Sequence, residues 1–401
     1  MVSTPKLRRR HLAAAAASFA ITRGAQAQPP DVIIGAPNCL TGGLGEAGQQ
    51  VVKGLELLAE QVNAAGGIKS LGGARLKIIP ADTSTDNPAQ AASVTRRLIA
   101  ENHCSALVGS HASTMTLSSQ IEAERGRVPI LTTSYADQIV ERGFKYTFKI
   151  PPQSASFGLA NIDYTRKIFA DAGRKLQRVA VFYGSDAGNG ANGRAEVAQV
   201  KKAGLDLVAS GSVPTGMSDP TPVVGPVLAT KPDLLMANLV TPDMVMVIHA
   251  LRAVGARLPI MTSGSGISVK SIPQNLGDQA DGFMGTVVWN DDLKVPGAAA
   301  FLKAFLKANP KQTFAPQEAG EGYATGQIIA AALEKAATTD PRKLRDAIAA
   351  IRVQTILPGG PVEFAPNGLS RHGIPLMVQW QKGELHTIWP KAYQTARPIV
   401  G

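Results

Sequence analysis

Short apolar runs alternate with amphipathic stretches along most of the chain. Val32–Ala36 is an apolar run typical of a strand that is buried on both faces. After a glycine-rich loop at 41–48, apolar residues recur at three- and four-residue spacing: Val52, Leu55, Leu58 and Val62. This spacing predicts a helix with one apolar face. We expect the helix to end at Asn63–Gly67, where glycine suits a left-handed cap.

The same alternation predicts the elements of the rest of the chain. Further strands are expected at 75–79, 105–109 and 128–132 and, after a proline-containing break at Ile150–Pro152, at 178–183, 205–209, 234–237, 259–262 and 285–289. Helices are expected at 88–101, 243–254, 298–308, 319–336 and 341–351. The last two strands, near 377–380 and 385–389, flank a hairpin turn at 381–384. This order predicts an α/β fold built from two parallel, doubly wound sheets.

The N-terminus has the features of an export signal. Arg8–Arg10 precede an apolar stretch at 11–21, and Ala25–Ala27 supplies a cleavage site with small residues. The stretch is shorter than the roughly 20 residues that a membrane-spanning helix needs. We interpret residues 1–27 as a signal peptide. Adjacent arginines favour the twin-arginine pathway, and the Sec pathway stays open as the alternative.

Charge and cysteine content narrow the classes of protein. The formal net charge is +11, and residues 1–27 hold five of the cations and no acid. The other cations are scattered among acids, so nucleic-acid binding is not expected. Cys39 follows the first strand, whereas Cys104 precedes the third. These positions lie at opposite edges of a parallel sheet, which predicts two unpaired thiols.

Motifs for catalysis or metal binding are weak. The six histidines show no metal-ligand spacing, no CxxC occurs, and no serine has the full GxSxG context, so no cofactor or metal is expected. Gly43–Gly48 matches G-x-G-x-x-G, but it begins seven residues after Ala36, and Asp82 follows 34 residues after Gly48. A dinucleotide site needs a tighter turn and a closer acid. The pattern favours a backbone loop that faces a cleft, with an exported NAD(P)-dependent enzyme as the alternative.

Several sequence blocks, taken in order, resemble one known family. The blocks are VIIGAPNCLTGGLGEAGQQVVKGLELLAEQVNAAGGI, VGSHASTMT, VPILTTSYADQIVERGFKYTFKI and DLLMANLVTPDMVMVIHALRAVG. They are similar to the periplasmic branched-chain amino acid and amide binding proteins of ABC importers, which have the type I periplasmic binding protein fold. The resemblance extends over residues 30–390.

The resemblance implies an architecture for the chain. Two Rossmann-like lobes would be joined by a three-segment hinge near 150–153, 283–289 and 355–361. Lobe 1 would comprise 28–150 plus 290–354, and lobe 2 would comprise 151–285 plus 360–401. A small-molecule ligand would bind between the lobes, at the carboxyl ends of the strands.

The resemblance also implies a set of ligand-binding residues. In the family a ligand carboxylate is held after the third and fourth strands; the matching positions here are Ser113, Thr114, Thr133, Ser134 and Tyr135. An open alternative is that Ser113 and Thr114 only cap the helix that follows. The family tyrosine and glutamate of the second lobe fall on Val240 and Gly264, so a buried ammonium would lack its usual partner.

The remaining candidates are residues that would complete the site. Asp186 is a candidate counter-ion, and Tyr135, Trp289 and Tyr323 are candidate walls or ordinary core residues. Leu44, in the glycine-rich loop, and Asn238, after the strand at 234–237, complete the predicted set.

These features together predict an exported, non-enzymatic, monomeric binding protein of the periplasm. Its expected ligand is a small organic acid, including an aromatic one, an amino acid or an amide. Its expected partners are the permease and ATPase subunits of an ABC importer. A ligand-sensing receptor module of the same fold is the second possibility.

Overall fold

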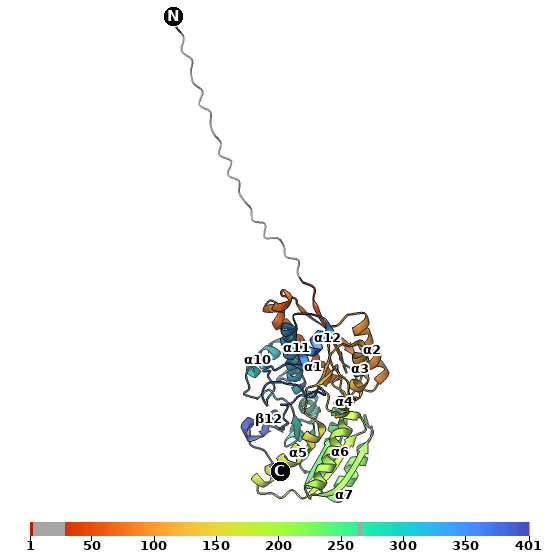
Figure 1. Ribbon diagram of the computed structural model, residues 1–401. Coiled ribbons are helices and arrows are strands. Elements are labelled where there is room, and N and C mark those ends of the chain that lie inside the picture. Colours follow the sequence, from red (N-terminus) through yellow and green to blue (C-terminus); the bar gives the residue numbers. More distant parts are fainter. Residues whose placement is uncertain (3–28, 264–265, 401) are drawn as a thin grey trace.

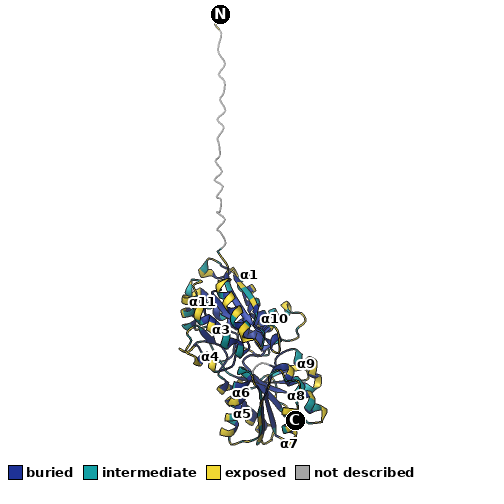
Figure 2. Cartoon of the chain, turned by 90° about the vertical axis from the view of Figure 1, so that its right-hand side faces the viewer, coloured by how far each residue is buried: buried dark blue, intermediate teal, exposed yellow. Residues whose placement is uncertain are grey.

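The chain folds into two lobes stacked end to end (Figure 1). The structure is a computed structural model that describes residues 1–2, 29–263 and 266–400. Apart from Met1 and Val2, the predicted signal peptide lies outside the described residues. Within each lobe the buried residues gather on the central strands, and exposed residues lie on the outer helices (Figure 2).

The first lobe is built on a five-stranded parallel sheet with the strand order β2-β1-β3-β4-β5. Its strands are β1 (Val32–Asn38), β2 (Leu76–Asp82), β3 (Ala106–Val108), β4 (Ile130–Thr132) and β5 (Thr147–Lys149). Its helices are α1 (Gly45–Ala64), η1 (Lys69–Leu71), α2 (Pro88–Ala100), α3 (Ser113–Gly126), α4 (Gln138–Glu141), α10 (Ala298–Ala308), α11 (Gln317–Ala336) and α12 (Pro341–Ala349). The last three helices return to this lobe, where α11 packs on α1.

The second lobe is built on a seven-stranded sheet with the order β12-β11-β10-β9-β8-β6-β7. Its strands are β6 (Arg178–Gly184), β7 (Asp206–Val213), β8 (Leu234–Asn238), β9 (Ile260–Ser263), β10 (Met284–Val287), β11 (Leu376–Gln381) and β12 (Glu384–Trp389). Its helices are α5 (Ser154–Asp171), α6 (Ala187–Lys202), α7 (Thr221–Thr230), α8 (Thr241–Ala253), α9 (Ser271–Leu276) and η2 (Gly277–Ala280), with η3 (Lys391–Tyr393) near the C-terminus. Among the described strands of this sheet, the pairs β10–β11 and β11–β12 are antiparallel and the other pairs are parallel.

The two-sheet α/β fold predicted from the sequence is confirmed, with one strand missed. The chain passes between the lobes three times: from β5 to α5, from β10 to α10, and from α12 to β11. The missed strand is β5, which has only three residues and no distinct apolar run. The two cysteines are free and buried, as predicted, and burial raises the pKa of each thiol to about 12.

Three helices begin at a residue whose side chain caps the first turn. Asn87, Asp186 and Asp340 each accept hydrogen bonds from backbone N–H groups in the first turn of α2, α6 and α12. Proline follows the cap in α2 and α12, where its fixed φ suits the first helical position. These caps satisfy N–H groups that a helix start leaves without partners.

Helices α1 and α11 cross closely because glycines lie at the contact. A Cβ at Gly54 would overlap the carbonyl oxygen of Ala319, and a Cβ at Gly322 would overlap that of Val51. No side chain larger than hydrogen fits at either place without moving a helix. This contact therefore fixes the position of α11 against the first sheet.

The second lobe contains a buried carboxyl group. Glu196 of α6 is fully buried, and its oxygens accept hydrogen bonds from Asn161 Nδ2 (2.6 Å), Asn238 Nδ2 (2.6 Å) and Ser263 Oγ (2.8 Å). Burial raises the pKa of Glu196 from 4.5 to about 7, and the three hydrogen bonds oppose part of that rise. These hydrogen bonds link α5, α6, β8 and β9 near the carboxyl end of β8, where Asn238 lies.

Replacing Gly322 tests the helix crossing. We expect Gly322→Ala to lower the free energy of unfolding by about 1–3 kcal/mol, because the added methyl group forces α1 and α11 apart. The exposed Glu60 of α1 provides the control, since Glu60→Ala should change stability by less than about 0.5 kcal/mol. Denaturant unfolding measures both. Equal stability of the two variants would show that the crossing is not tightly packed.

Replacing Glu196 tests its raised pKa. A raised folded-state pKa means that the neutral carboxyl contributes stability below pH 4.5, and that this contribution is lost as the pH rises to about 7. Relative to Glu196→Gln, the wild type should therefore lose up to about 3 kcal/mol of unfolding free energy over this window. Denaturant unfolding at a series of pH values measures the difference. A difference that does not change with pH would contradict the buried, proton-binding carboxyl.

Candidate functional site

The two lobes contact each other at the carboxyl ends of their parallel strands, where ligands of such sheets bind. The N–H of Ala187, at the start of α6, donates to Thr114 Oγ1 at the start of α3 (3.2 Å). Closer to the connecting segments, Ser268 donates to Glu318 (3.0 Å) and Ser271 donates to Glu46 (2.6 Å). The lobes are therefore closed on each other, and loops of both lobes cover the residues between them.

An apolar cluster lies on one side of this contact. Val240 of the second lobe packs with first-lobe residues in one buried group: Cys39, Leu44, Ala91, Ala112 and Met115. Leu44, a predicted site residue, is therefore part of the interface between the lobes. Beside the cluster is an open pocket of about 360 Å³ that is lined by both lobes, including Gly43, Glu46, Thr241 and Asn275.

The glycine-rich loop has a packing role. A Cβ at Gly48 would overlap the carbonyl oxygen of Cys39, and a Cβ at Gly43 would come within 3.5 Å of the Val240 side chain. Gly48 therefore lets the start of α1 lie close to the end of β1, whereas the distance at Gly43 is an ordinary contact that a larger residue could also make. Close packing explains the last glycine of the G-x-G-x-x-G match without a bound dinucleotide.

Ser113 lies at the first position of α3 and is buried, with 5% relative exposure. Its Oγ accepts hydrogen bonds from the N–H groups of Tyr135 and Ala136, each at 3.2 Å. The residue that precedes α3 is Ala112, which has no capping side chain. Ser113 and Thr114 therefore do not act as the N-cap of α3.

The loop that carries Ser113 is fixed by hydroxyl groups. Ser134 Oγ lies 2.7 Å from Thr116 Oγ1 and donates to the carbonyl of His111 (3.0 Å). Thr133 Oγ1 lies 3.1 Å from His111 Nδ1. Of the predicted residues after β4, Ser134 thus holds the β3–α3 loop in place, and Thr133 positions a histidine.

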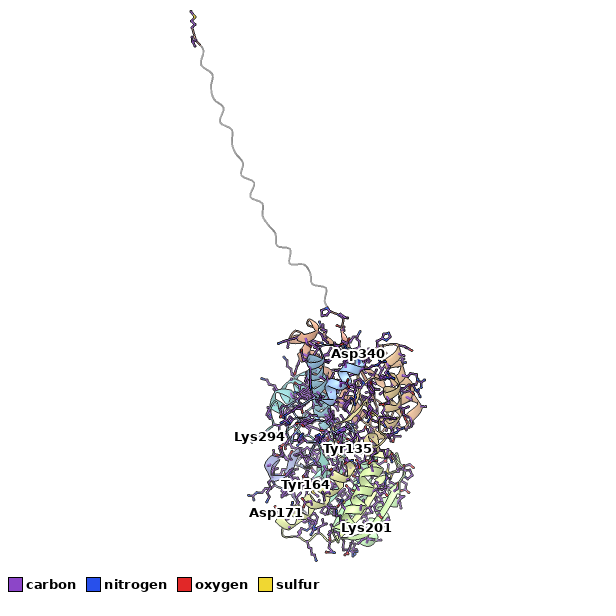
Figure 3. All side chains as sticks on the ribbon, viewed as in Figure 1. Tyr135, Tyr164, Asp171, Lys201, Lys294 and Asp340 are labelled. Carbon is purple, nitrogen blue, oxygen red and sulfur yellow. The ribbon has the colours of Figure 1, made fainter. Side chains whose placement is uncertain are left out.

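Tyr135 connects two parts of the interface. Its backbone contacts Ser113, and its ring packs edge-on against Phe157. Its hydroxyl lies 3.5 Å from Gln317 Oε1, at the start of α11. The residue is almost fully buried where the two lobes meet (Figure 3).

Among the described residues, the other predicted site residues make no hydrogen bond to Ser113, although Asp186 and Ser113 both lie against Gly188. Asp186 caps α6 and also accepts from Asn189 Nδ2 (2.8 Å) and Thr215 Oγ1 (2.9 Å), so both of its oxygens have donors. Asn238 holds Glu196. Trp289 and Tyr323 both pack against Phe301, and the Tyr323 hydroxyl donates to Gln61 (2.6 Å). Gly264, where the family glutamate falls, lies outside the described residues.

A group of buried polar residues was missed by the sequence analysis. His111 Nε2 lies 4.0 Å from Glu318 Oε1, and Gln317 Nε2 donates to the same oxygen (3.2 Å). Glu321 lies one turn further along α11, and all four residues have at most 3% relative exposure. We call His111, Gln317, Glu318 and Glu321 the α11 polar cluster. The signal was two acids three residues apart in a helix that is otherwise rich in small residues.

Burial sets the charges in this cluster. It lowers the pKa of His111 to about 4 and raises that of Glu318 to about 7. Burial and the neighbouring Glu318 raise the pKa of Glu321 well above its ordinary value. Lys149 approaches from β5, but its Nζ donates to the carbonyls of Pro151 and Pro152, and burial lowers its pKa to about 7. The described residues hold no group of three side chains suited to a metal ion.

Comparisons with known proteins agree with this geometry. The sequence profile described as "Periplasmic binding protein" matches residues 31–384. Among curated proteins, the chain is 24% identical over 387 residues to Leu/Ile/Val-binding protein homolog 7 of Brucella abortus (strain 2308), which covers 93% of this chain and 95% of that protein. It is 26% identical over 374 residues to homolog 8 of the same strain, covering 90% and 91%.

Solved structures with the same fold include two solute-binding proteins. A leucine-binding protein from Thermotoga maritima superposes with a TM-score of 0.79 at 19% identity, covering 89% of this chain and 97% of that one. A solute-binding protein of an ABC transporter from R. palustris, in complex with benzoate, superposes with a TM-score of 0.78 at 18% identity, covering 92% and 98%.

The family match excludes the alternative of an exported NAD(P)-dependent enzyme, because the family and fold are those of solute-binding proteins. Among the described residues, no helix has both the length and the apolar character needed to cross a membrane. The chain, with its two closed lobes and buried polar interface, belongs to the periplasmic binding protein family, in the group related to the branched-chain amino acid binding proteins of ABC transporters.

Proposed function

We propose that the protein binds a small organic acid between its lobes and delivers it to an ABC importer. The ligand carboxylate would lie at the N-terminus of α3, against Ser113. The proposed ligand class is a carboxylic acid, with amino acids and amides as related candidates.

The observation that carries the proposal is the uncapped start of α3 inside the interface. A helix N-terminus has free N–H groups and a partial positive charge, so it attracts anions. At α6, which faces α3 across the interface, Asp186 already supplies that anion. At α3 the preceding Ala112 supplies none, while Ser113 adds a hydroxyl. A ligand carboxylate would complete α3 as Asp186 completes α6.

The second lobe limits the ligand. Val240 is apolar and buried against Leu44, and Asp186 is occupied by its own helix. Neither residue offers a free anionic partner for an ammonium group beside the carboxylate, and an unpaired buried ammonium is costly. This favours an acid without an α-ammonium group over a leucine-like zwitterion. Benzoate, bound by one neighbour of the same fold, is such an acid.

Closure would follow from a shift between open and closed forms. The three connecting segments, predicted near 150–153, 283–289 and 355–361, would act as the hinge. A ligand that contacts both lobes favours the closed form by its difference in affinity for the two forms. The permease and ATPase of the importer would then recognise the closed protein. Export to the periplasm by the twin-arginine signal at residues 1–27 would place the protein beside the permease.

Replacing Ser113 tests the carboxylate site. We expect Ser113→Ala to weaken the binding of an acid ligand by about 1–3 kcal/mol, because a hydrogen bond to a charged group is lost. Calorimetry would first identify a bound acid from a panel that includes benzoate, phenylacetate, leucine and acetamide. The affinity of that acid is then compared between wild type and variant.

Ser119→Ala is the matched control. Ser119 is a buried serine of the same helix, and its Oγ has no hydrogen-bond partner among the described residues. This change should leave the affinity unchanged. Equal affinities of wild type and Ser113→Ala, or binding of branched-chain amino acids alone, would refute the proposed site and ligand class.

A further inference from the structure

The α11 polar cluster contains hydrogen-bonding groups that the protein itself does not satisfy. His111 Nε2 and both carboxyl oxygens of Glu321 have no hydrogen-bond partner among the residues that the structure describes. The indole nitrogen of Trp289 also has no hydrogen-bond partner there. The Trp289 ring packs on Gly320, which lies between Glu318 and Glu321 in the sequence. Buried polar groups are nearly always paired in folded proteins, and leaving one unpaired destabilises the fold. The cluster therefore has capacity for a further polar group.

The character of the cluster is acidic. Glu318 and Glu321 lie one helical turn apart. The charge of the buried Lys149 acts on Glu321, but its Nζ donates hydrogen bonds to the backbone carbonyls of Pro151 and Pro152 and to neither carboxyl group. The histidine nitrogen that points toward Glu318 belongs to a ring kept neutral by burial. Two carboxyl groups without a committed cation are best satisfied by a ligand group that is positive and donates several hydrogen bonds.

The cluster belongs to the interface between the lobes. Ser268 of the second lobe donates to Glu318 Oε2 at 3.0 Å, so a residue of the second lobe contacts the cluster when the lobes are closed. His111 is two residues before Ser113 on the same loop. A ligand enclosed at Ser113 is thus enclosed together with the cluster.

Tyr135 sets the separation of the two binding regions. Its N–H contacts Ser113 Oγ, and its hydroxyl lies near Gln317 of the cluster. The two regions are therefore about the length of a tyrosine side chain apart. In an α-amino acid only one carbon separates the ammonium group from the carboxylate, which is too short to reach both regions.

We propose that the α11 polar cluster binds an ammonium group at the far end of the ligand, so that the substrate is an ω-amino acid. The carboxylate lies at Ser113 and the N-terminus of α3, and the ammonium donates to Glu318 and Glu321. This assignment rests on the proposed function. It adds that the end of the ligand opposite the carboxylate carries an ammonium group.

Calorimetry with matched pairs of acids tests the assignment. The ω-amino acids from β-alanine through γ-aminobutyrate and δ-aminovalerate to ε-aminocaproate are each compared with the acid that lacks the amine. We expect at least one ω-amino acid to bind about tenfold or more tightly than its partner, the effect of a charge-assisted hydrogen bond. Norvaline, which has the δ-aminovalerate carbon chain with an α-amine, should bind more weakly than δ-aminovalerate.

Variants separate the two ends of the ligand. Glu321→Gln keeps the shape of the side chain and should remove most of the preference for the amine, while the affinity for the plain acid stays the same. Ser113→Ala should weaken both members of a pair by the same factor. Glu60→Gln, an exposed change in the same lobe, should alter neither. Circular dichroism and thermal unfolding would establish that each variant is folded.

The outcomes distinguish the two proposals. If plain acids and ω-amino acids bind equally and Ser113→Ala weakens both, the cluster holds only water and the further inference is wrong, whereas the carboxylate site stands. If no acid of any kind binds, the proposed function fails as well. The comparison of ligands on the wild type decides the question even if Glu321→Gln does not fold.

Discussion

Polar groups that are removed from water need partners, and this requirement governs the interface between the two lobes. Closure buries Ser113, His111, Glu318 and the N-terminus of α3, yet the protein supplies partners for only part of their capacity. Desolvation without replacement costs a few kcal/mol for each group. A solute that brings the missing hydrogen bonds removes this cost. Under the proposed function, ligand binding and closure would therefore be coupled through the same atoms.

Other contacts within the protein hold the remaining groups of the interface in place. Hydroxyl groups of Ser134 and Thr116 hold the β3–α3 loop, and the glycine contacts of α1 fix α11, which carries the acids. On the other lobe, Asp186 completes α6 before any ligand arrives. The unpaired groups of the α11 polar cluster, His111 Nε2 and the carboxyl oxygens of Glu321, belong to the first lobe. A preorganised site of this kind selects ligands by where their polar groups lie.

Much of the fold could be predicted from the sequence, because long apolar runs and regular helical spacing have few structural alternatives. Strand β8 and helix α11 were predicted in this way, whereas the short strand β5 (TFK) has no apolar run to reveal it. Ser113 was predicted from the resemblance to a family. Only the structure, in which Ala112 is the N-cap residue, could show that the Ser113 side chain does not cap α3. Glu318 and Glu321 were missed because acids in a helix are usually exposed, and their burial depends on how α11 packs on α1.

The central claim is that a solute between the lobes stabilises the closed form. Small-angle X-ray scattering measures it most directly, using protein that has been unfolded and refolded to remove any retained solute. Addition of an acid that binds by calorimetry should reduce the radius of gyration, since the lobes move together around the hinge. A radius of gyration that stays the same at saturating ligand would contradict the account.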